Sequence, residues 1–203
     1  IGDQSGERTG DAGDVIVRGH AWTTTDSEGN EVAHYSYMFY TYWANHIHIE
    51  GITFADGGYA TYLYDCQNTT IVDCEYSGQS YASIYCNYGS ATVDQCHIHD
   101  NVKHGILAYR GNYTVRDTQI LGCASGYGLY FYRHPEESAT QNVQCNAENV
   151  TIRGSGSWAL RAYYCNAILR DCIIEDNSYG VICFGGSTLI DVVVDDEEDS
   201  DGS

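Results

Sequence analysis

The chain has 203 residues, of which 28 are acidic and only 9 are lysine or arginine, so its formal net charge at pH 7 is −19. Such a charge argues against a nucleic-acid partner, because nucleic-acid binding depends on neutralising phosphates. No run of about 18 apolar residues occurs, so we expect no membrane insertion, and the length suits one domain with a hydrophobic core.

Three regions follow one another along the chain. Residues 1–14 are rich in Gly, Asp, Ser and Thr and predict a loose N-terminal arm, residues 15–194 carry internal repeats, and residues 195–203 form an acidic tail. We expect this tail to be solvated, with calcium collection or partner docking as the alternative. The sequence begins without an initiator Met or a signal peptide, so it is a processed chain or a piece of a longer one. We expect a mature secreted protein, extracellular or at the cell surface.

An aromatic-rich segment recurs about every 22 residues. Its copies begin at Tyr59, Tyr81, His104, Tyr127, Trp158 and Tyr179, and a looser copy begins at Tyr35. A second segment runs in phase with it, with apolar anchors at Ile49, Ile71, Val93, Val115 and Leu169, a degraded copy at Ile152 and a weak one at Ile190. Both segments alternate with period two and are separated by Gly, Asn, Asp and Ser, which predicts short strands joined by turns. A fixed period of this length indicates a solenoid.

Two to three short strands in each 22-residue turn resemble the right-handed parallel β-helix repeat family, the pectate-lyase-like coil found in polysaccharide lyases, tailspikes, adhesins and surface proteins. The resemblance covers roughly residues 15–194. It implies an all-β, right-handed, single-stranded parallel β-helix of about seven to eight coils. It implies little about activity, because this fold hosts many unrelated functions.

In that family pattern, the second and fourth positions after the leading aromatic point inward, and the third and fifth point outward. The outward fifth position is Tyr40, Tyr64, Cys86, Tyr109, Tyr132, Tyr163 and Phe184, and the third position includes Tyr62 and Tyr130. All of these except Cys86 form the predicted interaction surface. An outward apolar patch of this extent marks an interaction site. Contact with other protein chains is favoured because tyrosine buries a large ring and keeps a polar tip. Sugar stacking, or an inverted register that places the rings in the core, is the alternative.

The sequence therefore favours a structural or adhesive protein that associates with itself into a fibre or surface layer, through the ends of the coil and the tyrosine columns. A polysaccharide-binding or polysaccharide-degrading protein is the alternative. For an enzyme, Arg133, His134 and Glu136 are the candidate catalytic residues, because they lie in an insertion that lengthens one repeat step to 31 residues, from Tyr127 to Trp158, and inserted loops often carry function. An ice-binding face would require ranks of threonine, which the aligned repeats do not give.

Nine cysteines are present, an odd number. Cys74, Cys96 and Cys172 share one repeat position, which Ile52, Thr118 and Ser155 occupy in other copies. In the family pattern this position is an inward ladder, where a thiol behaves as a small apolar group. The other six cysteines are candidates for disulfides, and a Cys123–Cys145 bridge would close the insertion.

Two His-x-His pairs, His46/His48 and His97/His99, are candidate metal ligands, because alternate residues of a strand face one side. Glu75 lies one repeat before His97 and completes a possible set of ligands. Exposed surface histidines are the simpler interpretation, so we predict no cofactor, with calcium as the one alternative.

Glycosylation sequons begin at Asn68, Asn112 and Asn149, each three residues before an anchor. They indicate either surface glycosylation or a turn position where stacked Asn side chains bond to one another.

Overall fold

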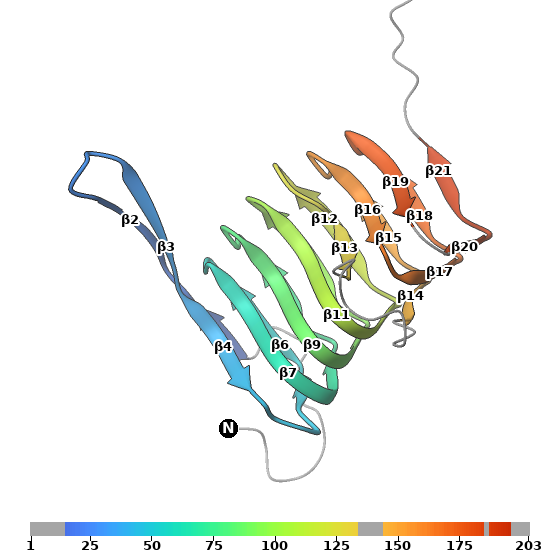
Figure 1. The fold of residues 1–203 in the computed structure, drawn as a ribbon, viewed down its shortest axis with the longest axis horizontal. Helices are drawn as coiled ribbons and strands as arrows, with labels where there is room; N and C mark the ends of the chain where they lie inside the picture. Colours follow the sequence, from blue (N-terminus) through green and yellow to red (C-terminus); the bar gives the residue numbers. More distant parts are fainter. Residues whose placement is uncertain (1–14, 134–143, 185–186, 196–203) are drawn as a thin grey trace, which may run out of the picture.

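The computed structural model describes residues 15–133, 144–184 and 187–195, and this part of the chain is built from strands and turns. Successive coils stack into a solenoid (Figure 1). The predicted arm at residues 1–14 and the tail from residue 196 lie outside the described residues, so both stay predictions.

The first of two parallel sheets receives one short strand from each coil. Its eight strands are, in spatial order, β1 (Val15–Arg18), β6 (Ile52–Ala55), β8 (Glu75–Ser77), β10 (His97–Asn101), β12 (Gln119–Cys123), β15 (Thr151–Arg153), β18 (Ile173–Glu175) and β21 (Val193–Asp195). Each strand pairs with the next in parallel, so equivalent side chains of successive coils lie above one another. This arrangement gives every side chain a fixed column along the solenoid.

The second sheet is longer, and it bends. In each coil an aromatic half, which contains the aromatic-rich segment, comes before the bend, and a polar half follows it. The first coil contributes two strands, β4 (Tyr37–Tyr42) and β5 (His48–Glu50). The next three coils contribute one continuous strand each: β7 (Tyr59–Val72), β9 (Ala82–Asp94) and β11 (His104–Arg116). The last three coils again contribute two strands each: β13 (Leu129–Tyr132) with β14 (Gln144–Glu148), β16 (Trp158–Tyr163) with β17 (Asn166–Arg170), and β19 (Tyr179–Phe184) with β20 (Ser187–Ile190). Neighbouring coils pair in parallel throughout.

The architecture confirms the all-β parallel solenoid predicted from the repeats. Among the described residues it makes about six turns, slightly fewer than expected. An antiparallel hairpin of β2 (Ala21–Thr25) and β3 (Glu31–Tyr35) is inserted into the first coil and projects from the sheets (Figure 1). Six regular coils run from β6 to β20; the hairpin interrupts the coil of β1, β4 and β5 that comes before them, and β21 follows them.

One hydrophobic core runs along the solenoid interior. On the first sheet it is a single column of large side chains, all at most 2% exposed, made of Phe54, Tyr76, Ile98, Ile120, Ile152 and Ile174. The rings of Phe54 and Tyr76 stack at 5.1 Å, and the Tyr76 hydroxyl, which would be costly to bury alone, lies 3.2 Å from Thr61 Oγ1.

The turn that leaves the second sheet repeats one backbone conformation in each coil. Its central residue has φ between +47° and +64° at Gly51, Asp73, Gln95, Asp117, Asn149, Asp171 and Asp191. Asp and Asn tolerate this left-handed region better than other residues that carry a side chain. Asp73, Asp117 and Asp171 therefore have a structural role in this turn.

Asn149 corrects the alignment of one repeat. We expected it to share the position of Asn68 and Asn112, but strand pairing places Ala147 beside Val115 and Ile152 beside Ile120. The copy after the insertion has alanine where other copies have a large apolar anchor, so Ile152, five residues later, was mistaken for the anchor. The column of Cys74, Cys96 and Cys172 consequently contains Val150 and not Ser155.

Candidate functional site

Three columns of mostly aromatic side chains cover the outward side of the aromatic half of the second sheet, and we call this surface the tyrosine face. Strand pairing and ring contacts define the columns, since paired residues of successive coils lie above one another. The first column is Tyr37, Tyr59, Tyr81, His104, Tyr127, Trp158 and Tyr179; the second is Tyr40, Tyr62, Tyr85, Leu107, Tyr130, Arg161 and Ile182; the third is Tyr42, Tyr64, Asn87, Tyr109, Tyr132, Tyr163 and Phe184. All eight predicted interaction residues lie in the second and third columns. Sequence reasoning missed the first column, although its signal, the leading aromatic of each repeat, was visible.

The copy that begins at Tyr81 is shifted by one residue from its predicted register. Tyr59 pairs with Ala82, so Tyr85 points outward whereas Ile84 and Cys86 point into the core. The prediction of Cys86 as an outward residue and of Tyr85 as an inward one was therefore wrong. The turn before this strand is one residue longer than the turn before β7, and a shift of one residue moves every side chain to the opposite face.

Neighbouring rings within a column lie 4.6–5.9 Å apart, and several pairs stack face to face whereas others meet edge to face. Tyr62 and Tyr85 stack at 4.6 Å with 15° between their planes, and Tyr42 and Tyr64 stack at 4.7 Å with 15°. The stacked pairs thus cover one another's ring faces. A pyranose ring stacks on an open aromatic face, so the middle of the tyrosine face offers few such positions.

Burial varies along the tyrosine face. Its centre is a hydrophobic cluster separate from the core, in which Leu107 is 1% and Tyr130 is 8% exposed. Burial raises the pKa of Tyr130 to about 12 and also raises the pKa of Tyr109. At the first described coil Tyr37, Tyr40 and Tyr42 are exposed. The side chains in the middle of the columns are therefore buried, whereas those at the ends of the columns are exposed to solvent.

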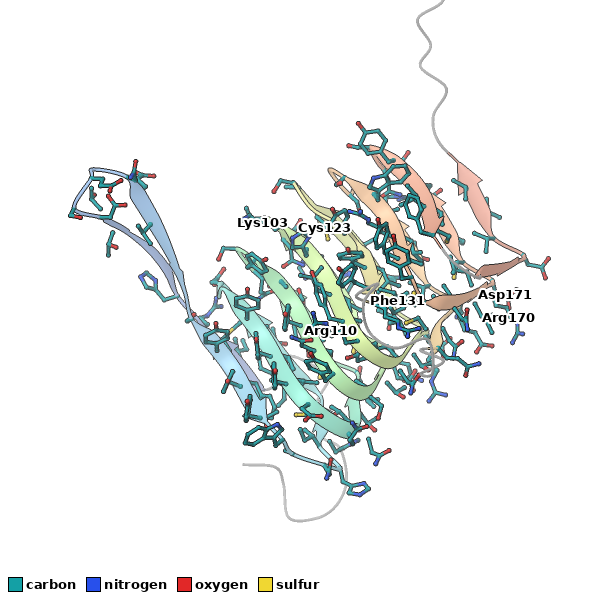
Figure 2. All side chains as sticks on the ribbon, viewed as in Figure 1. Lys103, Arg110, Cys123, Phe131, Arg170 and Asp171 are labelled. Carbon is teal, nitrogen blue, oxygen red and sulfur yellow. The ribbon has the colours of Figure 1, made fainter. Side chains whose placement is uncertain are left out.

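Three of the basic side chains lie against tyrosine rings of this face. Arg161 contacts the rings of Tyr127, Tyr130 and Tyr163 at 5.1–5.6 Å, and its Nη1 donates to the Tyr127 hydroxyl at 2.8 Å. Lys103, which directly precedes β11, lies over Tyr81, and Arg110 of β11 lies over Tyr88, whose ring contacts that of Tyr64 in the third column. Figure 2 labels both Lys103 and Arg110. The remaining described arginines, apart from Arg133, form ion pairs with carboxylates: Arg18, Arg116, Arg153 and Arg170. An acidic protein thus collects part of its scarce positive charge on the tyrosine face.

Glu75, His97 and His99 come together on the outward side of the first sheet. His97 and Glu75 are paired on adjacent strands, and the ligand atoms of all three residues lie within 4.8 Å of one another. The structure therefore brings together the three residues predicted as candidate metal ligands. The other pair is different, because His46 has a φ of +59° and lies outside the strands, while His48 contacts Glu50 at 2.9 Å.

A polar groove of about 440 Å³ lies on the polar half of the second sheet. Its lining includes a rank of threonines, Thr70, Thr92 and Thr114, paired across three coils. The expectation that no threonine rank exists was wrong, because the rank follows from strand pairing at positions that the aromatic repeat did not mark. Asn68, Ser90, Asn112, Gln144 and Asn146 complete the polar lining.

No disulfide joins the nine cysteines, all of which lie in the described residues, and eight of them are buried. The predicted disulfides are absent, and Cys123 and Cys145 lie on different sheets, so a bridge between them was a wrong prediction. The inward ladder of Cys74, Cys96 and Cys172 is as predicted. Each of these thiols lies 3.2–3.3 Å from the carbonyl oxygen two residues before it, so the ladder forms part of the core.

The sequon residues Asn68, Asn112 and Asn149 are all exposed. Asn149 Nδ2 donates to Asp117 Oδ1 at 2.6 Å, and Asn112 Oδ1 accepts from the Gln144 backbone. An inward Asn ladder at these three positions is therefore excluded, and surface glycosylation stays a prediction.

The candidate catalytic residues are only partly described. Arg133 is half-buried, and its backbone N–H donates to the Tyr163 carbonyl at 2.9 Å. His134 and Glu136 lie outside the described residues, so the catalytic role suggested for the insertion stays a prediction.

Comparisons with known proteins give a match over most of the solenoid. Residues 37–195 match the family described as "Right handed beta helix region". No curated protein and no solved structure matches the chain. Among the described residues, no helix is long and apolar enough to span a membrane.

Proposed function

The chain belongs to the right-handed β-helix family, and from this fold and its tyrosine face we propose that it is an extracellular structural or adhesive protein that assembles with further copies of itself. The observation that carries the proposal is the exposure of large apolar side chains on the outermost described coils. Apolar surface concentrated in this way favours contact with another protein surface.

Both ends of the described part of the solenoid combine exposed apolar groups with edge strands. At one end Val15 and Ile16 of β1 and Tyr40 of β4 are 45–55% exposed, and at the other end Tyr179 of β19 and Val193 of β21 are 56–58% exposed. The backbone groups at the free side of an edge strand are unpaired and favour pairing with a further strand. Each end can therefore pair with a further strand and bury its apolar side chains in the contact.

A second copy stacked on the end of the first would continue both sheets. In this arrangement β21 meets β1 and β19 meets β4 of the next copy, and the ring of Phe184 covers that of Tyr42. The contact joins different surfaces of the two copies, so it repeats at each free end and leads to a filament.

The assembly is tested with charged substitutions at each end. Tyr42→Lys and Val193→Lys place a cation on an edge strand, which opposes strand pairing, and Gln119→Lys places the same charge on an exposed site in the middle of the first sheet as a control. Light scattering and negative-stain microscopy should show elongated assemblies of the wild type and the control, but monomers of the end variants. A wild-type protein that stays monomeric at all concentrations would refute the proposal.

Polysaccharide binding is the second candidate, and the polar groove favours it. The groove is lined by hydroxyl and amide groups of Thr70, Thr92, Thr114, Asn112 and Asn146, which are donors and acceptors that match the hydroxyls of a neutral sugar chain.

Affinity electrophoresis with neutral polysaccharides, together with assays for reducing ends and unsaturated products, tests this candidate. Thr92→Val keeps the shape of the groove but removes a central hydroxyl, so it should weaken retention several-fold, whereas Asn87→Ser on the tyrosine face should not. Equal retention of both variants would contradict a role for the groove.

The extracellular location is supported by the exposure of the three sequon asparagines. Intact-mass measurement of protein secreted from a glycosylating host should show added glycans, which Asn→Gln substitutions at the sequons remove.

A further inference from the structure

The most specific chemical cluster outside the tyrosine face is formed by Glu75, His97 and His99. Strands β8 and β10 pair so that His97 lies beside Glu75, and His99 follows on the same side of its strand. His99 Nε2 is 3.0 Å from Glu75 Oε1, and the two imidazole rings lie 4.6 Å apart. Two ligands bound at about 2.0–2.1 Å to one tetrahedral zinc ion are roughly 3.3 Å apart. The three side chains are therefore already near the spacing that one ion requires.

Groups around the cluster hold two of these ligands in place. Asp100 Oδ2 lies 2.8 Å from His99 Nδ1, which orients the ring and directs Nε2 toward Glu75. A carboxylate on the second nitrogen of a ligating histidine is the usual support of a metal site, since it fixes the tautomer and raises the basicity of the ligand. Thr53 Oγ1 donates to the other Glu75 oxygen at 3.4 Å.

The electrostatics of the cluster fit a cation. Burial and the neighbouring His99 lower the pKa of His97. Burial lowers the pKa of His99, but bonds to Asp100 and Glu75 outweigh this and raise it overall. The chain's net charge of −19 also favours the approach of cations.

We propose that Glu75, His97 and His99 bind one divalent transition-metal ion of the zinc type, with Asp100 as the positioning residue. Imidazole nitrogens favour zinc, copper or nickel over calcium, which prefers oxygen ligands. Three protein ligands leave one coordination position for water or for a group from another molecule. The site does not depend on assembly of the solenoid, because all of its ligands come from one chain.

Zinc binding is measured by calorimetry with ZnCl₂ on the full chain near pH 7.5, with CaCl₂ as a second titrant. We expect one zinc ion per chain, no comparable calcium binding, and a loss of at least about tenfold in affinity for Glu75→Gln, His97→Gln and His99→Gln. Asp100→Asn should weaken binding by about 10–100-fold. Cobalt substituted for zinc should give the visible absorption of a four-coordinate site, which the three ligand variants lose.

His48→Gln is the matched control, because His48 also belongs to a His-x-His pair beside a glutamate but lacks the third ligand. Its affinity for zinc should equal that of the wild type. Affinity should fall as pH drops, because imidazole and carboxylate groups bind a metal ion only when they are deprotonated. Far-ultraviolet circular dichroism confirms that each variant is folded. Absence of stoichiometric zinc binding, or equal binding by folded ligand variants and wild type, would overturn the proposal.

Discussion

Single tyrosine residues differ in what surrounds their hydroxyl groups, although they look alike in the sequence. Tyr76 is fully buried in the core, and the Tyr113 hydroxyl donates to the Tyr109 carbonyl at 2.8 Å. Burial raises the pKa of both phenols well above the usual value and that of Tyr130 to about 12. Each of these groups must stay neutral for the fold to persist.

This difference predicts loss of stability in alkali. A phenol whose pKa is raised by folding contributes its full stability below pH 10, and this is lost as pH rises from about 10, where the unfolded chain ionises, toward the pKa of the folded state. Each unit of raised pKa is worth about 1.4 kcal/mol. Burial also raises the pKa of Cys123, to about 12, so its thiol contributes in the same direction.

Urea unfolding at pH 8 and at pH 11 should therefore show a lower midpoint at pH 11. Tyrosinate absorbance should show a class of phenols that ionise only on unfolding. If all tyrosines titrated near pH 10 in the folded protein, the buried positions would be contradicted.

At the scale of single strands, each short strand depends on its neighbours in the stack. Strand β10 has five residues, of which Ile98 lies in the core between Tyr76 and Ile120 on the adjacent strands. Because an isolated strand of this length has no stability of its own, inward packing and pairing with both neighbours hold it. Removal of one inward side chain therefore leaves a cavity between the two adjacent coils.

Ile98→Ala should lower the free energy of unfolding by about 2–5 kcal/mol, since it removes buried methyl groups from a packed column. Gln119→Ala on adjacent β12 is exposed and should change it by no more than about 0.5 kcal/mol. Chemical denaturation of both variants checks the difference. Equal stability of the two would contradict the inward register of the first sheet.

On the scale of the whole molecule, charge and apolar surface act in opposite directions. The net charge of −19 repels other copies of the chain, whereas the exposed apolar groups at both ends favour contact with them. Salt screens the repulsion between exposed charges, with a screening length of about 10 Å at 0.1 M and about 3 Å at 1 M, and does not weaken apolar contacts.

Self-association should therefore strengthen as NaCl rises from about 0.01 M to about 0.5 M. Sedimentation velocity at fixed protein concentration measures the shift toward larger species. Dissociation by salt would instead indicate an interface held by ion pairs and would contradict an apolar end contact.

The sequence by itself determined the solenoid, because the repeat and the alternation of inward and outward side chains are local properties of the chain. It also placed eight residues of the tyrosine face outward and brought Glu75 near His97, since repeats of equal length stack their equivalent positions. The cysteine column was predictable for the same reason, apart from the copy where Ala147 replaces the usual large anchor.

Only the tertiary structure decided which side chains face inward and which meet between coils, because both depend on the exact length of each turn. One extra residue before the strand of Tyr85 reversed the faces of Tyr85 and Cys86, and no local pattern marks such a residue. Arg161 contacts the rings of Tyr127 and Tyr130, which belong to another coil, and His99 bonds to Glu75, which lies 24 positions earlier in the chain. Their contacts exist only once the coils are stacked, because the register between coils sets which side chains meet.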